Sequence, residues 1–350
     1  MSKRHGLVSV ITPCYNAASF VAETIKSVAD QDYPDLEHIV IDDGSTDGSW
    51  SLLEGYGEGI KLLRLAENHG GSYARNRGVE VASGEFLLFL DADDLIAPDT
   101  ISALVASVYA RPGSIAVCRW QRLHVTPEGD WTPGLPDHPF PPPPDALRGW
   151  LMGNWVPPCA VLWRRDAYDC SGGWDEAIHL NDDGDLMMRA LTEGAQLVPA
   201  VGGMALYRDH GDSRLSVSAT VFTAERLESQ RRILERISDR LKQLGRWEEY
   251  RVPLGIAYHR VALVGFRVGQ VAVAREFLRQ GEELGGCDVS RTRLGRLVAR
   301  IVGLERKERI ALALAKFGLM TRARRTIHRR GLLQSQNEQV EGCQDRRNVI

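Results

Sequence analysis

The sequence predicts a layered α/β domain followed by a region of helices, and three observations support this fold class. Over the first hundred residues, short β-branched or apolar runs alternate with segments whose apolar residues recur at helical spacing. Acidic or polar clusters follow several of these runs. After about Val217, charged segments with helical spacing replace the strand-like runs. We therefore expect an α/β domain at residues 1–216, a helical region at 217–330 and a disordered polar tail at 331–350.

The strands and helices follow in order from these patterns. The β-branched run at 7–12 predicts the first strand, which Pro13 ends. Further strands are expected at 37–42, 60–65, 85–90, 115–119, 157–164 and 197–207. Helices are expected after residues 16–19, at 72–82, at 98–110, after residues 182–185 and at 222–244, with shorter helices and a helical hairpin around 258–284. The proline-dense stretch 133–144 predicts an extended surface loop.

The stretch Phe86–Asp94 is the feature around which the α/β domain is organised. Five consecutive apolar residues predict a strand that is buried on both faces, and the carboxylates of Asp91, Asp93 and Asp94 follow it. Charged groups are costly to bury, so these carboxylates are expected where the strand leaves the core. Taken alone, a D-x-D sequence is more typical of a solvated acidic turn.

Other clusters at predicted strand ends change this interpretation. Asp42–Asp43, Asp182–Asp183 and His210 each lie at the end of a predicted strand or close after one. In a layered sheet such ends share one edge, where ligands usually bind. Convergence of several clusters at that edge is harder to explain by solvation than any one cluster. The sequence therefore predicts a functional site there.

Composition and charge exclude several classes of function. The 350 residues are 43% hydrophobic and 25% charged, which is ordinary for a globular protein. A net charge of −3 gives no basis for binding nucleic acid. The six cysteines form no C-x-x-C pair, which predicts free thiols in a reducing compartment. Without a signal-peptide pattern or an apolar run near the roughly 20 residues that cross a bilayer, a cytoplasmic protein is expected.

The C-terminal region is more basic than the rest of the chain. From Arg291 onward basic residues dominate, and Arg322, Arg324, Arg325, Arg329 and Arg330 belong to this group. These helices are expected either to dock peripherally on anionic lipid, near a lipid-linked acceptor, or to form a solvated face.

The motifs, in their order and spacing, resemble those of glycosyltransferase family 2. The matching segments are VSVITPCYN at 8–16, IDDGSTD at 41–47, ARNRG at 74–78, GEFLLFLDADD at 84–94, GGWDE at 172–176, DDGDL at 182–186 and YRDH at 207–210. The resemblance covers about residues 7–216. It implies a GT-A fold, a mixed and mostly parallel sheet flanked by helices. It also implies inverting transfer of a sugar from a nucleotide-diphosphate donor, most naturally a UDP-sugar, to a hydroxyl of a saccharide or lipid-linked acceptor.

The resemblance also implies roles for individual residues. Thr12, Pro13, Tyr15 and Asn16 would line the nucleotide pocket, Asp42 would accept from the base, Arg75 would lie near the base or diphosphate, and Asp91 would reach the ribose or the metal. Asp93 and His210 would ligate Mn²⁺ or Mg²⁺, and Asp183 would be the general base. This division of roles is chemically reasonable. A divalent ion neutralises the leaving diphosphate, and a carboxylate opposite it deprotonates the attacking hydroxyl, so no covalent intermediate is needed.

The position of the base has alternatives. Asp182 and Asp185 are other registers for it, and Asp182–Asp183 could also cap a helix. The chain has Asp182 where the family commonly has Glu, and Gly184 where an aromatic residue is common. Gly184 is expected to loosen this turn and to alter the local contacts with an acceptor.

Other candidate residues have structural alternatives. Asp42 could cap the next helix, Arg75 could simply neutralise nearby carboxylates, and His210 could be a surface histidine that ends a strand. Trp155 and Trp174 could form a sugar-stacking wall, although large apolar side chains are more often part of a core.

Three other classes of function compete with the transferase. A dinucleotide-dependent oxidoreductase needs G-x-G-x-x-G after its first strand, and Thr12–Asn16 does not match it. A phosphatase with a D-x-D nucleophile fits Asp93–Leu95 poorly. The third alternative is an inactive relative that binds a nucleotide sugar without transferring it. Loss of Asp93 or of the later acid would indicate such a relative, and both are present.

Overall fold

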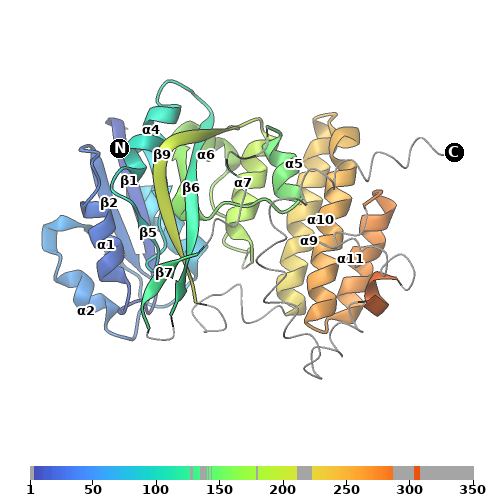
Figure 1. Ribbon diagram of the computed structural model, residues 1–350, viewed down its shortest axis with the longest axis horizontal. Coiled ribbons are helices and arrows are strands. Elements are labelled where there is room, and N and C mark those ends of the chain that lie inside the picture. The colour runs from blue at the N-terminus through green and yellow to red at the C-terminus, as the bar shows by residue number, and fades with distance from the viewer. Residues whose placement is uncertain are drawn as a thin grey trace. The chain divides into compact units, whose positions relative to one another are not determined.

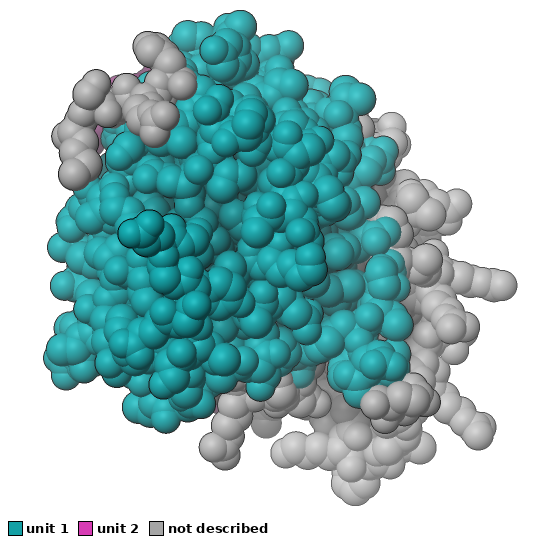
Figure 2. Space-filling model, turned by 90° about the vertical axis from the view of Figure 1, so that its left-hand side faces the viewer, with its two compact units in different colours: residues 1–150, 154–220 teal, residues 151–153, 221–350 magenta. Residues whose placement is uncertain are grey.

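The computed structural model describes residues 4–126, 129–134, 140, 142, 144–178, 180–210, 223–286 and 303–307. The chain forms two compact units, one of residues 1–150 and 154–220 and one of residues 151–153 and 221–350. Figure 2 shows the first unit in teal. The expected domain boundary at 216/217, the expected tail at 331–350 and the basic residues 322–330 lie outside the described residues.

The first unit is built on one mixed sheet (Figure 1). Among the described residues, nine strands pair in the order β3-β2-β1-β4-β8-β6-β9-β5, and β7 pairs with β6. The strands are β1 (Arg4–Cys14), β2 (Leu36–Asp42), β3 (Lys61–Arg64), β4 (Gly84–Phe89), β5 (Leu95–Ile96), β6 (Ser114–Val125), β7 (Trp131–Pro133), β8 (Val161–Arg164) and β9 (Gln196–Asp209). Strands β1 to β4 pair in parallel, as do β6 and β9. The expected mixed α/β sheet is confirmed.

Helices flank this sheet in the first unit. They are α1 (Val21–Ala29), α2 (Ser49–Glu54), α3 (Gly71–Val81), α4 (Thr100–Val108), α5 (Ala146–Leu151), α6 (Arg165–Ser171) and α7 (Asp182–Thr192), with single 3₁₀ turns η1 (Gly57–Gly59) and η2 (Pro158–Ala160). Strands β5 and β7 and helices α5 and α6 were not expected, because elements this short show no clear periodicity. Strand β6 runs six residues past the expected end at 119, because it continues to pair with β9 as far as His124↔Asp209.

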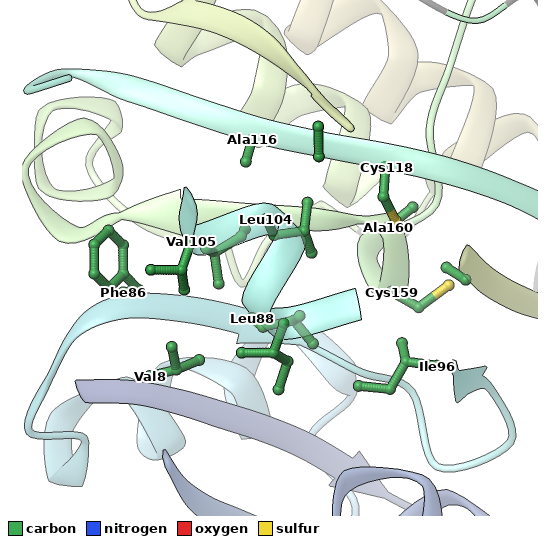
Figure 3. Close-up of a cluster of buried hydrophobic side chains, with 14 of the residues drawn as sticks. Val8, Phe86, Leu88, Ile96, Leu104, Val105, Ala116, Cys118, Cys159 and Ala160 are labelled. Carbon is green, nitrogen blue, oxygen red and sulfur yellow. The ribbon is translucent and has the colours of Figure 1, made fainter. Parts of the chain in front are cut away.

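The two faces of the sheet carry separate parts of the core. On one face, Val8, Phe86 and Leu88 pack against Leu104 and Val105 of α4 (Figure 3). On the other face, Phe89 contacts the rings of Tyr168 and Trp174, with centroids 5.6 and 5.0 Å away. Strand β4 is therefore buried on both sides, as its unbroken apolar run predicts.

Helix α3 approaches the second face closely because of a glycine. A Cβ atom at Gly78 would lie 2.5 Å from Ile11 Cγ2 and 2.8 Å from Ile41 Cδ1. A larger residue would push the helix away from β1 and β2. This contact fixes α3, which carries Arg75, against the strands that end at the candidate site.

The second unit is helical. It contains α9 (Ala224–Gln243), α10 (Trp247–Arg267) and α11 (Val271–Glu283), and α10 and α11 form the expected hairpin. Helix α10 is longer than expected, with 21 residues, and it includes Pro253. None of the helices in the described ranges combines the length and the apolar character that a membrane span requires.

The described cysteines agree with the prediction of free thiols. Cys14, Cys118 and Cys159 are buried, Cys170 is exposed, and none of the four is in a disulfide. Cys287 and Cys343 lie outside the described residues.

Candidate active site

The carboxyl ends of three neighbouring parallel strands form the centre of the site. Strand β1 pairs with β2 up to Cys14↔Asp42 and with β4 up to Ile11↔Phe89. The amides of Asp43 and Leu90 continue these ladders to the carbonyls of Cys14 and Ile11, at 2.8 and 3.0 Å. The segments that follow the three strands therefore begin side by side. This edge is where ligands bind in open α/β sheets.

Asp42 is a fully buried carboxylate without a hydrogen-bond partner. Its exposed fraction is 0%, and neither oxygen accepts a hydrogen bond. The nearest cation is the Arg64 guanidinium on β3, with Nε 3.6 Å from Oδ2. Buried polar atoms are usually hydrogen-bonded, because an unpaired one costs free energy. Asp42 is therefore a buried acceptor that no described group satisfies with a hydrogen bond.

The neighbouring Asp43 has a different environment. Its carboxylate accepts from the amides of His69 and Gly70 at 2.9 and 2.8 Å and from Asn68 Nδ2 at 3.1 Å. These bonds hold the 68–70 loop against the end of β2. Asp43 thus stabilises the loop, whereas the Asp42 oxygens accept no hydrogen bond.

The predicted nucleotide residues at the end of β1 fall into two groups. Thr12 is buried, and its Oγ1 lies 3.0 Å from Nε2 of His38, whose pKa burial lowers to about 3. Pro13 is half-buried beside it. Tyr15 is 48% exposed, and Asn16 has a φ of 51°. Thr12 thus supports the strand, while Tyr15 lies at the open edge.

Asn16 connects the loops that follow β1 and β2. Its side-chain Oδ1 accepts from the Thr46 backbone amide at 2.8 Å, and its backbone amide donates to Ser45 Oγ at 3.0 Å. A non-glycine residue with positive φ is uncommon, and asparagine tolerates it better than most residues. The Asn16 bonds offset this strain and fix the rim of the site.

Arg75 connects the end of β4 to the start of α7. Its Nη2 donates to Asp91 at 2.6 Å, its Nη1 donates to Asp182 at 3.1 Å, and the guanidinium lies 4.4 Å from the Trp174 ring centroid. Ser72 Oγ also donates to Asp182, at 2.9 Å. These contacts are those expected of an arginine that neutralises nearby carboxylates. Trp174 is buried beneath Arg75 and packs on Phe89, so it belongs to the core.

The acids at the start of α7 have different partners, which bears on the register of the base. Asp182 is bound by Arg75 and Ser72, and Asp185 is fully buried and pairs with Arg189 at 2.9 Å. Among the described residues, the side chain of Asp183 has no ion-pair partner within 4 Å. Burial, together with the adjacent Asp182 carboxylate, raises the pKa of Asp183 to about 7.

A neighbouring side chain fills the space beside Gly184. Asn181 adopts a φ of 61° just before α7, and a Cβ atom at Gly184 would lie 2.1 Å from Asn181 Oδ1. Asn181 thus occupies the space that a side chain at 184 would need. The turn before Asp183 is filled rather than open, contrary to the expectation that Gly184 loosens it.

The raised pKa of Asp183 predicts a pH dependence. If Asp183 is the base, it acts only when deprotonated, so kcat/KM should rise about tenfold per pH unit below pH 7 and level off above it. The sign follows from burial, which favours the neutral acid and moves its deprotonation towards neutral pH. Initial rates from pH 5.5 to 9 at saturating metal measure this profile. A flat profile from pH 5.5 to 7 would contradict the prediction.

Asp93 and His210 face each other across the turn after β4. His210 Nε2 lies 2.8 Å from Asp93 Oδ2, and the ring packs between Phe20 and Trp131, with centroids 5.1 and 5.2 Å away. Within the described ranges, no three His, Cys, Asp or Glu side chains form a metal-binding group. One carboxylate and one imidazole nevertheless suit a divalent ion that takes its other ligands from phosphate and water, and the imidazole suits Mn²⁺. The donor set therefore fits the expected ion.

Sequence reasoning missed several residues that hold this arrangement together. Ser72 and Trp131 carry no motif signal, since Ser72 contacts an acid 110 residues away and Trp131 lies on a three-residue strand. Asp94 accepts a hydrogen bond from the backbone amide of Arg208 at 2.9 Å, which holds the turn after β4. Trp155 packs against Trp120 and Tyr207, with centroids 4.9 and 5.9 Å away.

Comparisons with known proteins agree with this fold. The chain is similar to S. aureus TarS 1–349 in complex with UDP-GlcNAc, with a TM-score of 0.68, 22% identity and coverage of 89% of this chain and 92% of that one. It is also similar to GalNAc-T7 with UDP, GalNAc and Mn²⁺, with a TM-score of 0.50, 18% identity and coverage of 65% and 47%. The sheet and its flanking helices are those of the GT-A fold.

Sequence relatives match part of the chain. TuaG of Bacillus subtilis (strain 168), named for teichuronic acid biosynthesis, is 47% identical over 91 residues, which are 25% of this chain and 36% of TuaG. TarS of Staphylococcus aureus (strain Mu50), a poly(ribitol-phosphate) β-N-acetylglucosaminyltransferase, is 38% identical over 105 residues, 29% of this chain and 18% of TarS. The chain thus spans about a third or less of the length of these two relatives. The model of glycosyl transferase family 2 matches residues 9–171 of this chain, and both of these relatives are named glycosyltransferases.

Proposed function

We propose that the protein is an inverting glycosyltransferase that moves a sugar from a nucleotide-diphosphate donor, most naturally a UDP-sugar, to a hydroxyl of a saccharide or lipid-linked acceptor. One observation carries this proposal. The Asp42 carboxylate, which accepts no hydrogen bond, the Asp93–His210 pair and Asp183, with its pKa of about 7, all follow strand ends or begin the helix joined to them by Arg75. The family and the named relatives support the same reaction class.

The donor nucleotide is proposed to bind at the ends of β1 and β2. Asp42 would accept a hydrogen bond from the base, for which uracil N3–H is a suitable donor. Thr12, Pro13, Tyr15 and Asn16 would line this pocket. The UDP-GlcNAc and UDP bound to the TarS structures support a uridine donor.

Asp91 and Arg75 are proposed to form the wall between the base and the sugar. Asp91 would reach the ribose with the oxygen that Arg75 does not engage. Arg75 would lie near the diphosphate, with its charge partly neutralised by Asp91 and Asp182. The Arg75 guanidinium binds both Asp91 and Asp182. It would therefore hold Asp91, on the donor side, at a fixed separation from the start of α7, where the base lies.

Asp93 and His210 would hold a divalent cation, Mn²⁺ or Mg²⁺. When bound, such an ion neutralises charge on the leaving diphosphate. The Mn²⁺ in the GalNAc-T7 structure supports this choice. The chain contributes one carboxylate and one imidazole, so most of the coordination is left to the donor and water.

Asp183 is proposed to be the general base. A carboxylate with a pKa near 7 combines a large deprotonated fraction at neutral pH with good basicity. It would take the proton of the acceptor hydroxyl as the oxygen attacks the anomeric carbon from the side opposite the leaving diphosphate. One displacement of this kind inverts the anomeric configuration.

The surroundings of the reaction are proposed as well. We expect a cytoplasmic enzyme, with peripheral membrane contact through the basic C-terminal helices where the acceptor is lipid-linked. A liposome flotation assay of the full chain, with and without anionic lipid, measures that contact.

The proposal is tested with a panel of nucleotide sugars. Purified protein is incubated with Mn²⁺ or Mg²⁺, each donor and a set of hydroxyl acceptors, and release of the nucleoside diphosphate is measured. We expect release from UDP-sugars, with an acceptor product of inverted configuration. Tight UDP binding without release for every donor and acceptor would instead support the inactive relative.

A further inference from the structure

Arg208 lies behind the Asp93–His210 pair and binds the turn that carries Asp93. Its Nη1 donates to the backbone carbonyl of Asp93 at 2.7 Å, and its backbone amide donates to Asp94 Oδ1 at 2.9 Å. Its Nη2 donates to the Glu23 carboxylate on α1. A single residue of β9 therefore connects helix α1 to the turn that follows β4.

Two aromatic rings hold Arg208 and His210 together. The guanidinium carbon of Arg208 lies 5.2 Å from the Phe20 ring centroid and 5.5 Å from that of Trp131. The His210 ring contacts the same two rings. Alternate residues of an extended chain point to the same side, which explains this shared environment. The Arg208 side chain is only 1% exposed, so its geometry is set by the protein rather than by water.

The way Arg208 binds Asp93 leaves the carboxylate available. The guanidinium contacts the backbone carbonyl, while Asp93 Oδ2 faces His210. Arg208 thus fixes the orientation of Asp93 without binding the Asp93 carboxylate. We propose that Arg208, anchored by Glu23, is a positioning residue that holds Asp93 and His210 at the separation needed to share a divalent cation. This inference rests on the proposed function, which assigns that cation to the two residues.

Only an arginine can make this set of contacts. The planar guanidinium reaches the Asp93 carbonyl with one terminal nitrogen and Glu23 with the other, whereas a lysine ammonium is a single point of charge on a flexible stem. Residues that orient metal ligands typically change metal affinity by about 10–100-fold when they are replaced. We therefore expect Arg208→Lys, which keeps the charge, to weaken Mn²⁺ binding nearly as much as Arg208→Gln.

Arg164 provides a matched control at the other end of β4. Its Nη1 donates to the Tyr109 carbonyl at 2.9 Å, its Nη2 lies 3.0 Å from Glu85, and its guanidinium lies over the Phe86 ring at 5.5 Å. It thus binds a carbonyl, a glutamate and an aromatic ring, as Arg208 does. Phe86 pairs with Arg164 near the start of β4, whereas the acids follow the end of that strand.

The experiment is a titration of the full chain with Mn²⁺ in the presence of UDP, with free Mn²⁺ measured by electron paramagnetic resonance. We expect Arg208→Lys and Arg208→Gln to raise the Mn²⁺ dissociation constant about 10–100-fold, and Glu23→Gln to raise it by a smaller factor. Arg164→Lys should leave this constant unchanged. Thermal melting of each variant separates loss of metal affinity from loss of fold.

The outcomes separate this inference from the proposed function. If the wild-type protein binds no Mn²⁺ with UDP, the cation assignment and the inference both fail. If the wild type binds Mn²⁺ and the Arg208 variants behave like Arg164→Lys, the inference alone is overturned. If the Arg208 variants do not fold, Glu23→Gln tests the inference in their place. This variant should fold, because it alters only a carboxylate whose side chain is 61% exposed. An unchanged Mn²⁺ affinity in Glu23→Gln would then refute the positioning role.

Discussion

Replacement of Asp183 by asparagine is expected to lower kcat by about 10²–10⁴-fold, the usual contribution of a positioned general base. The amide keeps the size of the side chain but cannot take a proton. Because Asp183 has no ion-pair partner within 4 Å among the described side chains, the variant should keep the surrounding contacts. UDP affinity should therefore stay close to that of the wild type. Steady-state kinetics with a donor from the panel, together with UDP titration, measure both quantities.

The same substitution should raise the stability of the folded protein, although it lowers kcat. A carboxyl whose folded-state pKa is raised to about 7, above its unfolded value near 3.8, binds more protons in the folded state between these pH values. Wild-type stability therefore falls as the pH rises through this window, and the full loss is present above pH 7. The amide of the variant carries no charge to bury, so Asp183→Asn should raise the melting temperature above that of the wild type at pH 8. Lower activity with higher stability is the result expected of a functional acid.

Asp182→Asn is the matched control for the register of the base. It removes the negative charge that pairs with Arg75, so it should lower the melting temperature and weaken donor binding. The rise of kcat/KM with pH should remain, because Asp183 is intact. If Asp182→Asn abolishes that pH dependence and Asp183→Asn keeps near wild-type kcat, the base is Asp182 and the assignment is wrong.

The fold and the edge that carries the site could be predicted because both depend on local patterns. The run Phe86–Leu90 is apolar at every position, so it indicates a doubly buried strand wherever that strand pairs. Asp42 and Asp91 follow such runs, and the carboxyl ends of parallel strands meet at one edge. These two facts are enough to predict the approximate location of the site.

The partners of the acids could not be predicted in the same way. Arg75 and Asp182 are 107 residues apart, and Arg208 and Glu23 are 185 apart, so no periodicity relates them. The sequence left Asp182, Asp183 and Asp185 as alternative candidates. Their partners differ, because Asp182 pairs with Arg75 of α3 and Asp185 pairs with Arg189 within α7. Short elements such as β7, which brings Trp131 to His210, are likewise set by tertiary pairing.

Asp93→Asn is expected to reduce metal-dependent turnover by about 10²–10⁴-fold, because a divalent ion contributes several kcal/mol of charge stabilisation to a departing diphosphate. The amide removes the charge of the pair, while its carbonyl oxygen remains near His210. The turn itself should persist, since Arg208 holds the backbone carbonyl of Asp93 and not its side chain. Rates across a Mn²⁺ titration should show a much higher metal requirement in the variant.

Asp209→Asn is the control for this substitution. Asp209 is the neighbour of His210 in sequence, and its carboxylate pairs with Arg122 at 3.2 Å. The control removes the same charge within one residue of the site, so a general electrostatic effect would appear in both variants. A specific role requires that only Asp93→Asn shifts the Mn²⁺ dependence.

His210→Gln completes the test because it separates the two ligands. The imidazole is the softer donor of the pair, so its loss should weaken Mn²⁺ more than Mg²⁺, whereas loss of the Asp93 carboxylate should weaken both ions. The ratio of Mn²⁺-supported to Mg²⁺-supported rates should therefore fall in His210→Gln. If that ratio is unchanged while the fold is intact, His210 is not a ligand, and Asp93 binds the ion with donor and water oxygens alone.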